Sequence, residues 1–541
     1  MSPQQQPNRL TRSAFLRTAT GTVAAATAMP LVGFPAPAEA KTSSPAAAGD
    51  GSGAAGALFE ELDAKIRAAM KEYAIPGVAV GMIHRGERYI KGYGVTNVDY
   101  PVPVDGDTLF RIGSTTKTFT GTAAMRLVDR GELDLDARVR TYLPEFATSR
   151  PSVARRVTLR QLLNHSAGWL GEYYADMGRG DDALARYVKS MERLPQLTPP
   201  GETFFYNNAA VVLSGRVIEV VTGSTYEEAV RELVLDPLGL THSRFFSDEI
   251  VGFNVAASHV IAEGGEPVVD NSVWHLPRSI HSTGGLISSV HDQLRYAAFH
   301  LGDGRAPDGT RLLKTKSLLE MRSNPGPGGT LYVELDGMGV TWQLRPSAQG
   351  VRIVQHGGDW PGQHSGFIMV PERGFALTVL TNSEGGPKLI SDLFVEDWAL
   401  RRFAGVSNLP AKPRALSRRE LAPYEGLYTG RTIDPPGTKP GDTVTQTTKI
   451  ELKGTSDGRL RMTGRYVVEP DVLGAPSDVA RAEDAPAVEQ RLVFYREDYV
   501  RVYDQSGKPT PQRADFLRDH EGRVEWLRFG ARLFRHQGAS T

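Results

Sequence analysis

Two kinds of hydrophobic pattern succeed each other along this chain, and they meet in a stretch with Pro and Arg at residues 408–419. Before it, apolar runs typical of strands stand at both ends of a long segment with helical spacing. After it, short runs alternate between apolar and polar residues and are separated by turns. A chain of 541 residues is too long for one core, so the change predicts two folded units.

The first unit, residues 57–405, is predicted to be an α/β (α+β) structure. Helical spacing starts at Leu58, dominates residues 118–240 and returns at residues 389–403 as a closing helix. Strands at both ends with helices between them indicate one antiparallel sheet whose last strands come from the end of the unit. The helices between form an inserted helical subdomain. The predicted strands are Val78–Ile83, Arg88–Gly94, Phe367–Val370 and Phe375–Leu380.

The second unit, residues 421–541, follows a linker at 406–420 and is predicted to be an all-β barrel or sandwich. Residues 454–458 match the G-x-S-x-G pattern of a nucleophile elbow. That elbow needs a buried strand before it and a helix after it, whereas alternating strands flank this site, so we interpret it as a hairpin turn. The predicted strands include residues 449–452, 459–462, 492–495, 499–503 and 524–532.

The amino terminus has the three regions of an export signal. Arg9, Arg12 and Arg17 precede an Ala- and Thr-rich stretch, and an A-x-A cleavage pattern ends at Ala40. The segment resembles a twin-arginine signal, but Ser13 replaces the second arginine. Residues 1–40 therefore predict export to a secreted or extracytoplasmic location, with a disordered basic tail as the alternative. Residues 41–56 are rich in Ala, Gly and Ser, which is typical of a flexible linker.

Charge and composition exclude several classes of protein. Lys+Arg and Asp+Glu are both 62, so no bulk charge favours nucleic acid or anionic lipid. Without the signal, 59 basic and 61 acidic residues remain. No later segment is apolar over the roughly 18 residues that a membrane span needs. Cys is absent, which excludes thiolate catalysis and zinc–thiolate sites, and the sequence predicts neither cofactor nor metal.

Ser114 and Lys117 form an S-x-x-K motif at the point where a short strand, residues 109–112, passes into a helix. Residues three apart share a helix face, so Lys117 is expected beside Ser114. A serine hydroxyl needs an adjacent base to become a nucleophile, and a lysine that loses its proton in a dry pocket is such a base. The motif predicts a nucleophile and its base.

Two further motifs follow in order: Tyr206-Asn207-Asn208 and His356-Gly357-Gly358. Ser-x-x-Lys, Tyr-x-Asn and His-x-Gly in this order resemble the penicillin-recognising serine hydrolases. That family includes class C β-lactamases, D-alanyl-D-alanine carboxypeptidases, D-aminopeptidases and esterases. The resemblance covers residues 58–405 and implies a β-lactamase-like fold. The carboxy-terminal β unit resembles the lipocalin-like domains of D-aminopeptidase-like members.

The resemblance implies a role for each motif residue. Ser114 is the acylated nucleophile, while Lys117 and Tyr206 share proton transfer. Asn208 binds the substrate amide. His356, Gly357 and Gly358 lie on the strand at the cleft, where a side chain in place of either glycine would block substrate. The backbone N–H groups of Ser114 and Asp359 form the oxyanion hole.

Each residue also has a purely structural interpretation. Tyr206 alone would be a core tyrosine, Asn208 a helix cap and His356 a turn residue. His165 is expected to be structural and to fasten a loop.

The motif on the cleft strand begins with His356 instead of the lysine of β-lactamases, and Asp359 follows it. Histidine is only partly charged near neutral pH, and an aspartate adds an anion. We therefore expect neutral or amine-bearing substrates to be preferred over penicillins.

The sequence predicts an exported serine hydrolase that forms an acyl-enzyme at Ser114 and is either a D-residue peptidase or amidase or a carboxypeptidase-like enzyme, with a small-molecule or peptide substrate. The alternatives are a broad esterase or transacylase, a class C β-lactamase, and a non-catalytic sensor of cell-wall peptides or β-lactams. The oligomeric state is left open.

Overall fold

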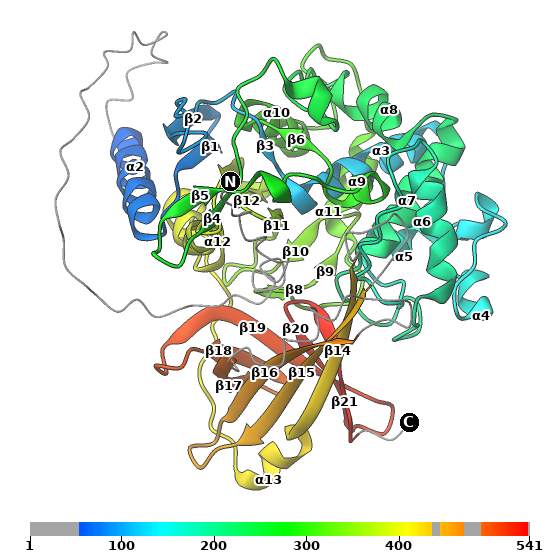
Figure 1. The fold of residues 1–541 in the computed structure, drawn as a ribbon, viewed down its shortest axis with the longest axis vertical. Coiled ribbons are helices and arrows are strands. Elements are labelled where there is room, and N and C mark those ends of the chain that lie inside the picture. Colours follow the sequence, from blue (N-terminus) through cyan, green and yellow to red (C-terminus); the bar gives the residue numbers. More distant parts are fainter. Residues whose placement is uncertain (1–53, 435–443, 470–487, 539–541) are drawn as a thin grey trace, which may run out of the picture.

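The computed structural model describes residues 54–434, 444–469 and 488–538. The predicted export signal and most of the predicted linker after it lie outside these residues. Within them the chain forms an α+β body followed by a closed β-barrel (Figure 1). This confirms the predicted order of an antiparallel sheet with helices and then an all-β unit.

A seven-stranded antiparallel sheet organises the body within the described ranges. Its order is β2-β1-β13-β12-β11-β10-β9, so the first strands of the chain pair with one of the last, as the pattern predicted. The strands are β1 (Gly77–His84), β2 (Glu87–Gly94), β9 (Gly337–Met338), β10 (Gln343–Arg345), β11 (Ile353–Trp360), β12 (Gln363–Val370) and β13 (Phe375–Thr381).

Helices cover both faces of this sheet because alternate residues of β1 are apolar on both sides. Val80 packs in the same cluster as Ile66 of α2 (Ala54–Glu72). Ala79 packs in the cluster that holds Leu294 of α10 (Val290–Leu301). The sheet is therefore the middle layer of three.

Most remaining helices lie between β2 and β9 in sequence and form the helical part of the body (Figure 1). They are α3 (Thr116–Arg130), α4 (Pro151–Ala154), α5 (Leu159–Leu163), α6 (Ala183–Ser190), α7 (Asn208–Thr222), α8 (Tyr226–Val230), α9 (His281–Gly284) and α11 (Thr315–Ser323). Short strand pairs join β3 (Phe110–Arg111) to β6 (Ile287–Ser288), β4 (His259–Ile261) to β5 (Pro267–Val269), and β7 (Gly329–Thr330) to β8 (Glu334–Leu335).

The predicted single helix over residues 389–403 is wrong. The chain forms α12 (Gly386–Ile390) and continues as a π-helical turn, Ser391–Val395. The helix is then interrupted before a second π-helical turn, Leu400–Ala404. Asp397 breaks the helix because its φ is 57°, a left-handed value that is costly within a helix. Its carboxylate accepts a hydrogen bond from Asn408 N at 2.6 Å, which holds the break in place.

The barrel closes through eight antiparallel strands, preceded by α13 (Arg418–Leu421). The predicted turn at residues 454–458 is confirmed, because β15 ends at Gly454 and β16 begins at Leu460. The predicted strand 524–532 is wrong, since Gly530 and Ala531 turn the chain with φ values of 55° and 58°. The strands are β14 (Gly426–Asp434), β15 (Val444–Gly454), β16 (Leu460–Glu469), β17 (Val488–Arg496), β18 (Tyr499–Tyr503), β19 (Pro509–Arg518), β20 (Val524–Phe529) and β21 (Arg532–His536).

The barrel is fastened to the body by buried polar contacts. Arg528 pairs with Asp515 within the barrel at 2.5 Å and donates to Phe204 O in the body at 2.5 Å. Glu334 of the body pairs with Arg513 and Arg496 of the barrel. No helix among the described residues is both long enough and apolar enough to cross a membrane.

Candidate active site

Ser114 and Lys117 lie side by side, as the S-x-x-K spacing predicted. Ser114 belongs to a 3₁₀ turn, Gly113–Thr115, that leads directly into α3. Lys117 Nζ is 2.9 Å from Ser114 Oγ and donates a hydrogen bond to Thr283 O at 2.8 Å. The side chain of Lys117 is completely buried. Burial lowers the pKa of Lys117 well below its usual 10.5, and the charge of Arg532 lowers it further, against the opposing effect of Glu172.

Tyr206 completes the group around Ser114. Its ring lies 5.0 Å from Lys117 Nζ and stacks on His165 with 4.7 Å between ring centroids. Burial raises the pKa of Tyr206, and a hydrogen bond to Ser114 opposes that rise. The phenol therefore keeps its proton at neutral pH and is able to donate it. Tyr206 is thus both a core residue and a neighbour of the predicted nucleophile.

The two asparagines after Tyr206 have different places. Asn207 caps α7, because its Oδ1 accepts a hydrogen bond from Ala210 N at 2.9 Å. The helix-cap interpretation of Asn208 is therefore wrong by one position. Asn208 Nδ2 instead donates to the hydroxyl of Tyr174 at 2.8 Å. Asn208 is therefore free of the capping role and is buried beside Tyr174.

His165 fastens the loop before α7, as its structural interpretation predicted. Its Nδ1 accepts a hydrogen bond from Asn207 N at 2.8 Å, and its ring is fully buried. Burial lowers the pKa of His165 well below 6.5, and the charge of Lys117 acts in the same direction. The imidazole is therefore neutral, which its role as an acceptor requires.

His356, Gly357, Gly358 and Asp359 all lie on β11, which passes directly over the 3₁₀ turn of Ser114. A Cβ atom on Gly358 would lie 1.9 Å from Ile112 O and 2.6 Å from Ser114 N. Gly358 thus has a packing role that the sequence did not predict: it lets the strand touch the backbone of the nucleophile. A Cβ atom on Gly357 would meet only Ser365 O, at 3.1 Å.

His356 is a neutral residue of the cleft wall. It is buried, and its Nδ1–H donates to Gly357 O at 2.7 Å. Burial lowers the pKa of His356 to about 3, and the charge of Lys117 lowers it as well. At neutral pH this side chain supplies no positive charge for a substrate carboxylate.

Asp359 is the anion that the sequence places after the cleft-strand motif, and the structure pairs it with a histidine. His364 lies opposite it on β12 and donates from Nδ1 to Asp359 Oδ1 at 2.8 Å. Burial opposes protonation of His364, but Asp359 and Glu384 outweigh it and raise the pKa of His364 above 6.5. The Asp359 side chain remains 63% exposed at the cleft.

Arg532 is one of the side chains near Ser114 that sequence reasoning missed, together with Glu172 and His364. Arg532 begins β21 of the barrel, and its guanidinium lies 5.3 Å from the centroid of the Tyr206 ring. Its Nη2 is 3.1 Å from Glu172 Oε1. Burial opposes the charge of Arg532, but the carboxylate of Glu172 outweighs it and raises the pKa of Arg532. The site therefore contains a permanent cation beside Lys117, whose own charge burial disfavours.

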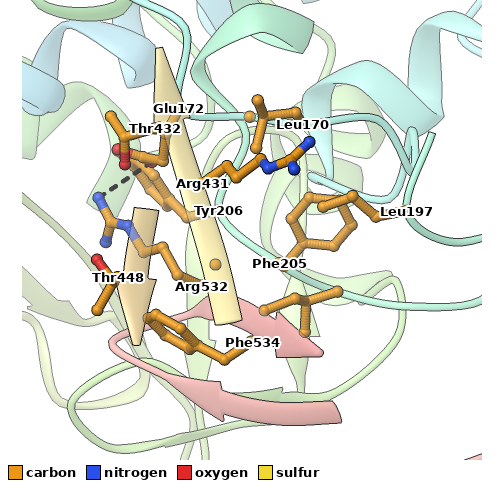
Figure 2. Close-up of a pocket in the computed structure, with 13 residues that line it drawn as sticks. Leu170, Glu172, Leu197, Phe205, Tyr206, Arg431, Thr432, Thr448, Arg532 and Phe534 are labelled. Atoms are coloured by element: carbon orange, nitrogen blue, oxygen red, sulfur yellow. Dashed lines mark ion pairs between the residues drawn. The ribbon is translucent and has the colours of Figure 1, made fainter. Parts of the chain in front are cut away.

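Arg532 also lines a pocket between the body and the barrel. Figure 2 shows the guanidinium directed at Glu172, with Tyr206 beside them and the ring of Phe205 on the other side of the pocket. Leu170 and Leu197 of the body and Phe534 of the barrel complete its apolar part. The turn that carries Arg532 is held by Tyr206 itself, whose backbone N donates to Ala531 O at 2.8 Å.

Comparison with known proteins now identifies the group around Ser114. Residues 62–397 match the family model described as beta-lactamase. The chain belongs to the beta-lactamase family. This confirms the resemblance that the three motifs indicated.

Relatives of this beta-lactamase-family chain differ in how far they extend. It is 37% identical to penicillin-binding protein 4 of Amycolatopsis lactamdurans over 362 residues, which cover 66% of this chain and 94% of that protein. The solved structure of SurE aligns with 90% of this chain and over 100% of the SurE chain, with a TM-score of 0.65 and 24% sequence identity. An octameric penicillin-binding protein homologue from Pyrococcus abyssi covers 88% of this chain and 99% of its own, with a TM-score of 0.55 and 26% identity. The likeness to SurE thus extends over body and barrel as a similarity of fold.

Proposed function

We propose that this protein is a serine hydrolase that forms an acyl-enzyme at Ser114 and acts on D-residue peptides or amides in the manner of a carboxypeptidase. One observation carries the proposal. Lys117 Nζ is 2.9 Å from Ser114 Oγ in a fully buried position that lowers the pKa of Lys117. A neutral amine beside a hydroxyl is a general base in place for nucleophilic attack.

The geometry supports a complete proton path. Lys117 takes the proton of Ser114 Oγ as the oxygen attacks the substrate carbonyl carbon. The backbone N–H groups of Ser114 and Asp359 stabilise the resulting oxyanion. Tyr206 gives its phenol proton to the leaving amine or alcohol, and the Lys117 ammonium returns a proton to Tyr206. Water then attacks the ester of Ser114 by the same steps in reverse and releases the acid.

Relatives and charge support the substrate class. One relative is named a penicillin-binding protein, one solved structure is SurE with D-Leu, and another is a D-alanine carboxypeptidase from Burkholderia cenocepacia. Arg532 offers a cation for an anionic substrate group where His356 is neutral. A broad esterase or transacylase and a class C β-lactamase would use the same nucleophile. A sensor without turnover is less well supported, because binding alone does not require a deprotonated lysine.

We also propose that the protein is exported and acts outside the cytoplasm. The proposal rests on the arginines, the Ala- and Thr-rich stretch and the A-x-A pattern within residues 1–40. Mass spectrometry of the protein recovered from culture medium would give the cleavage point, and full-length protein retained in the cytoplasm would contradict export.

Ser114→Ala tests the acyl-enzyme. We expect it to abolish hydrolysis of a p-nitrophenyl ester and of D-alanine p-nitroanilide, and to abolish covalent labelling by a fluorescent penicillin. Ser456→Ala is the matched control, because Ser456 lies in the hairpin turn between β15 and β16, and should leave both readouts unchanged. Esterase activity that persists in folded Ser114→Ala would refute the assignment.

A further inference from the structure

Asp359 extends its side chain from the same residue whose backbone contacts the segment of the nucleophile. A Cβ atom on Gly113 would lie 2.7 Å from Asp359 N, and one on Gly358 would lie 2.6 Å from Ser114 N. The two backbone nitrogens of the proposed oxyanion hole therefore belong to segments in direct contact. A substrate whose carbonyl oxygen binds between them lies against Asp359.

One oxygen of the Asp359 carboxylate is held by a buried partner, and the other is free. His364 donates from Nδ1 to Oδ1 at 2.8 Å. Among the residues that the structure describes, Asp359 Oδ2 has no hydrogen-bond partner. The Asp359 side chain is 63% exposed and that of His364 only 1%, so a ligand meets the carboxylate and not the imidazole. An ionised carboxylate only accepts hydrogen bonds, and its strongest donors are cations.

The carboxylate of Asp359 faces the part of the cleft that holds the proton-transfer group. Burial raises the pKa values of Tyr206 and of Tyr332, and the negative charge of Asp359 raises both further. Such an effect requires the carboxylate to lie near both phenols. Tyr206 is itself the neighbour of Ser114, so a group bound to Asp359 Oδ2 lies close to the reacting atoms.

The other charged groups of the cleft leave Asp359 as the anion that a ligand meets first. Burial lowers the pKa values of Lys117 and His356, which favours their neutral forms. Arg532 is 28% exposed and is already paired with Glu172 at 3.1 Å. The more exposed charge is therefore negative, and it complements a positively charged substrate group.

We propose that Asp359 is a specificity-determining residue whose free carboxylate oxygen binds the ammonium group of an amino-acid substrate. In such a substrate the ammonium is bonded to the carbon next to the reacting carbonyl. A carbonyl oxygen bound at Asp359 N therefore brings the ammonium close to the side chain of the same residue. The proposal rests on the proposed function and names its substrate class: amides and peptides in which the residue that acylates Ser114 has a free α-amine.

The test compares two p-nitroanilides of the same shape, those of D-alanine and of isobutyric acid. A methyl group in the second takes the place of the ammonium in the first. The readout is the ratio of their kcat/KM values, measured at a pH where the amine is protonated. Asp359→Asn keeps the shape and the backbone N–H but removes the charge. It should lower the ratio about tenfold, as expected for the loss of a hydrogen bond between charged groups.

A matched control removes the same charge elsewhere. Asp457 pairs with Arg459 in the hairpin turn between β15 and β16 and is 49% exposed, so Asp457→Asn should leave the ratio unchanged. Asp359→Glu keeps the charge and should retain a higher ratio than Asp359→Asn. An unchanged ratio in Asp359→Asn would overturn the proposal, as would an equal loss on both anilides, which indicates damage to the site and not a lost contact with the ammonium.

The wild type supplies a second test, which also applies if Asp359→Asn fails to fold. Salt screens an exposed charge pair, so the ratio should fall as NaCl is raised from about 0.05 to about 0.5 M. A ratio that does not respond to salt would overturn the proposal. Failure of the proposed function is distinguishable, because the wild type would then hydrolyse neither anilide and Ser114 would remain unlabelled by a fluorescent penicillin.

Discussion

Lys117 shows how burial changes the chemistry of a single side chain. In water an ammonium group at pH 7 has no lone pair to accept a proton, and arginine would stay charged in any environment. The fully buried position of Lys117, with Arg532 as a further cation near it, favours the neutral amine. Tyr206, whose pKa is raised, keeps the proton that the leaving group needs. In the proposed mechanism the two side chains therefore form one relay.

We expect Lys117→Ala and Tyr206→Phe each to lower kcat by about 10²–10⁴-fold, since each removes a proton-transfer group. The double variant should lose about as much as the worse single variant, because the two groups act in one relay. Steady-state kinetics with a p-nitrophenyl ester measures all three, and thermal melting checks that they are folded. A double loss equal to the product of the single losses would show that the groups act independently.

His364 makes the charge of the cleft depend on pH. Below its raised pKa the imidazolium compensates Asp359, and above that pKa the neutral imidazole does not. The ratio of kcat/KM for an anionic substrate to that for a neutral one should therefore fall, by about fivefold, as pH rises above 6.5 through the pKa of His364. His364→Gln should show the low ratio at every pH. A flat ratio in the wild type would contradict the compensation of Asp359 by His364.

At the scale of single residues, the sequence predicts contacts between residues that lie close together along the chain. Ser114 and Lys117 are three residues apart on one helix face, so their contact follows from helix geometry. Asp359 and His364 face each other across the hairpin of β11 and β12, and the Pro361-Gly362 turn between them is the sequence signal for that pairing. No pattern near Arg532 points to Tyr206, because only the packing of the barrel against the body brings them together.

Strand β11 is the element that fixes the cleft, and its two glycines make different contacts. Gly358→Ala should lower both the melting temperature and kcat, the latter by about 10²-fold, because its Cβ would meet the backbone of Ile112 and Ser114. Gly357→Ala should retain the fold, since its Cβ meets a single carbonyl oxygen at 3.1 Å. Melting curves and ester kinetics compare the pair. Equal effects of the two substitutions would contradict this account.

Elements were predicted where their periodicity is strong and missed where one residue interrupts it. α2 and β1 follow their apolar pattern closely. The apolar pattern of the predicted helix at 389–403 continues across Asp397, and that of the predicted strand at 524–532 continues across Gly530 and Ala531. At these three residues a positive φ turns the chain. Apolar spacing shows which face of a helix or strand is buried. It does not show where the backbone turns locally while the same face stays buried.

At the scale of the whole molecule, buried polar contacts hold the barrel to the body: Arg528, which pairs with Asp515 within the barrel, donates to Phe204 O, and Arg513 pairs with Glu334 of the body. Arg528→Ala should cost about 3–5 kcal/mol of unfolding free energy, because it leaves Asp515 charged and buried without its partner. Arg496→Gln should cost at most about 1 kcal/mol, since Arg496 is 49% exposed. Urea denaturation measures both. Similar losses of unfolding free energy in the two variants would show that the buried contacts of Arg528 stabilise the protein no more than the exposed Arg496 pair does.

The late closure of the sheet and the return of the barrel to Tyr206 set the order in which a newly made chain completes the candidate site. Gly77 N donates to Asn382 Oδ1, 305 residues away, and Arg528 donates to Phe204 O across 324 residues. Contacts this distant form slowly, since a long loop must close before they are made. Ser114 is synthesised early and strand β11 follows later within the body, whereas Arg532 and the Ala531 carbonyl that accepts from Tyr206 N arrive only with the last strands of the barrel. A nascent chain halted before Ala531 therefore carries Ser114 without the complete candidate site.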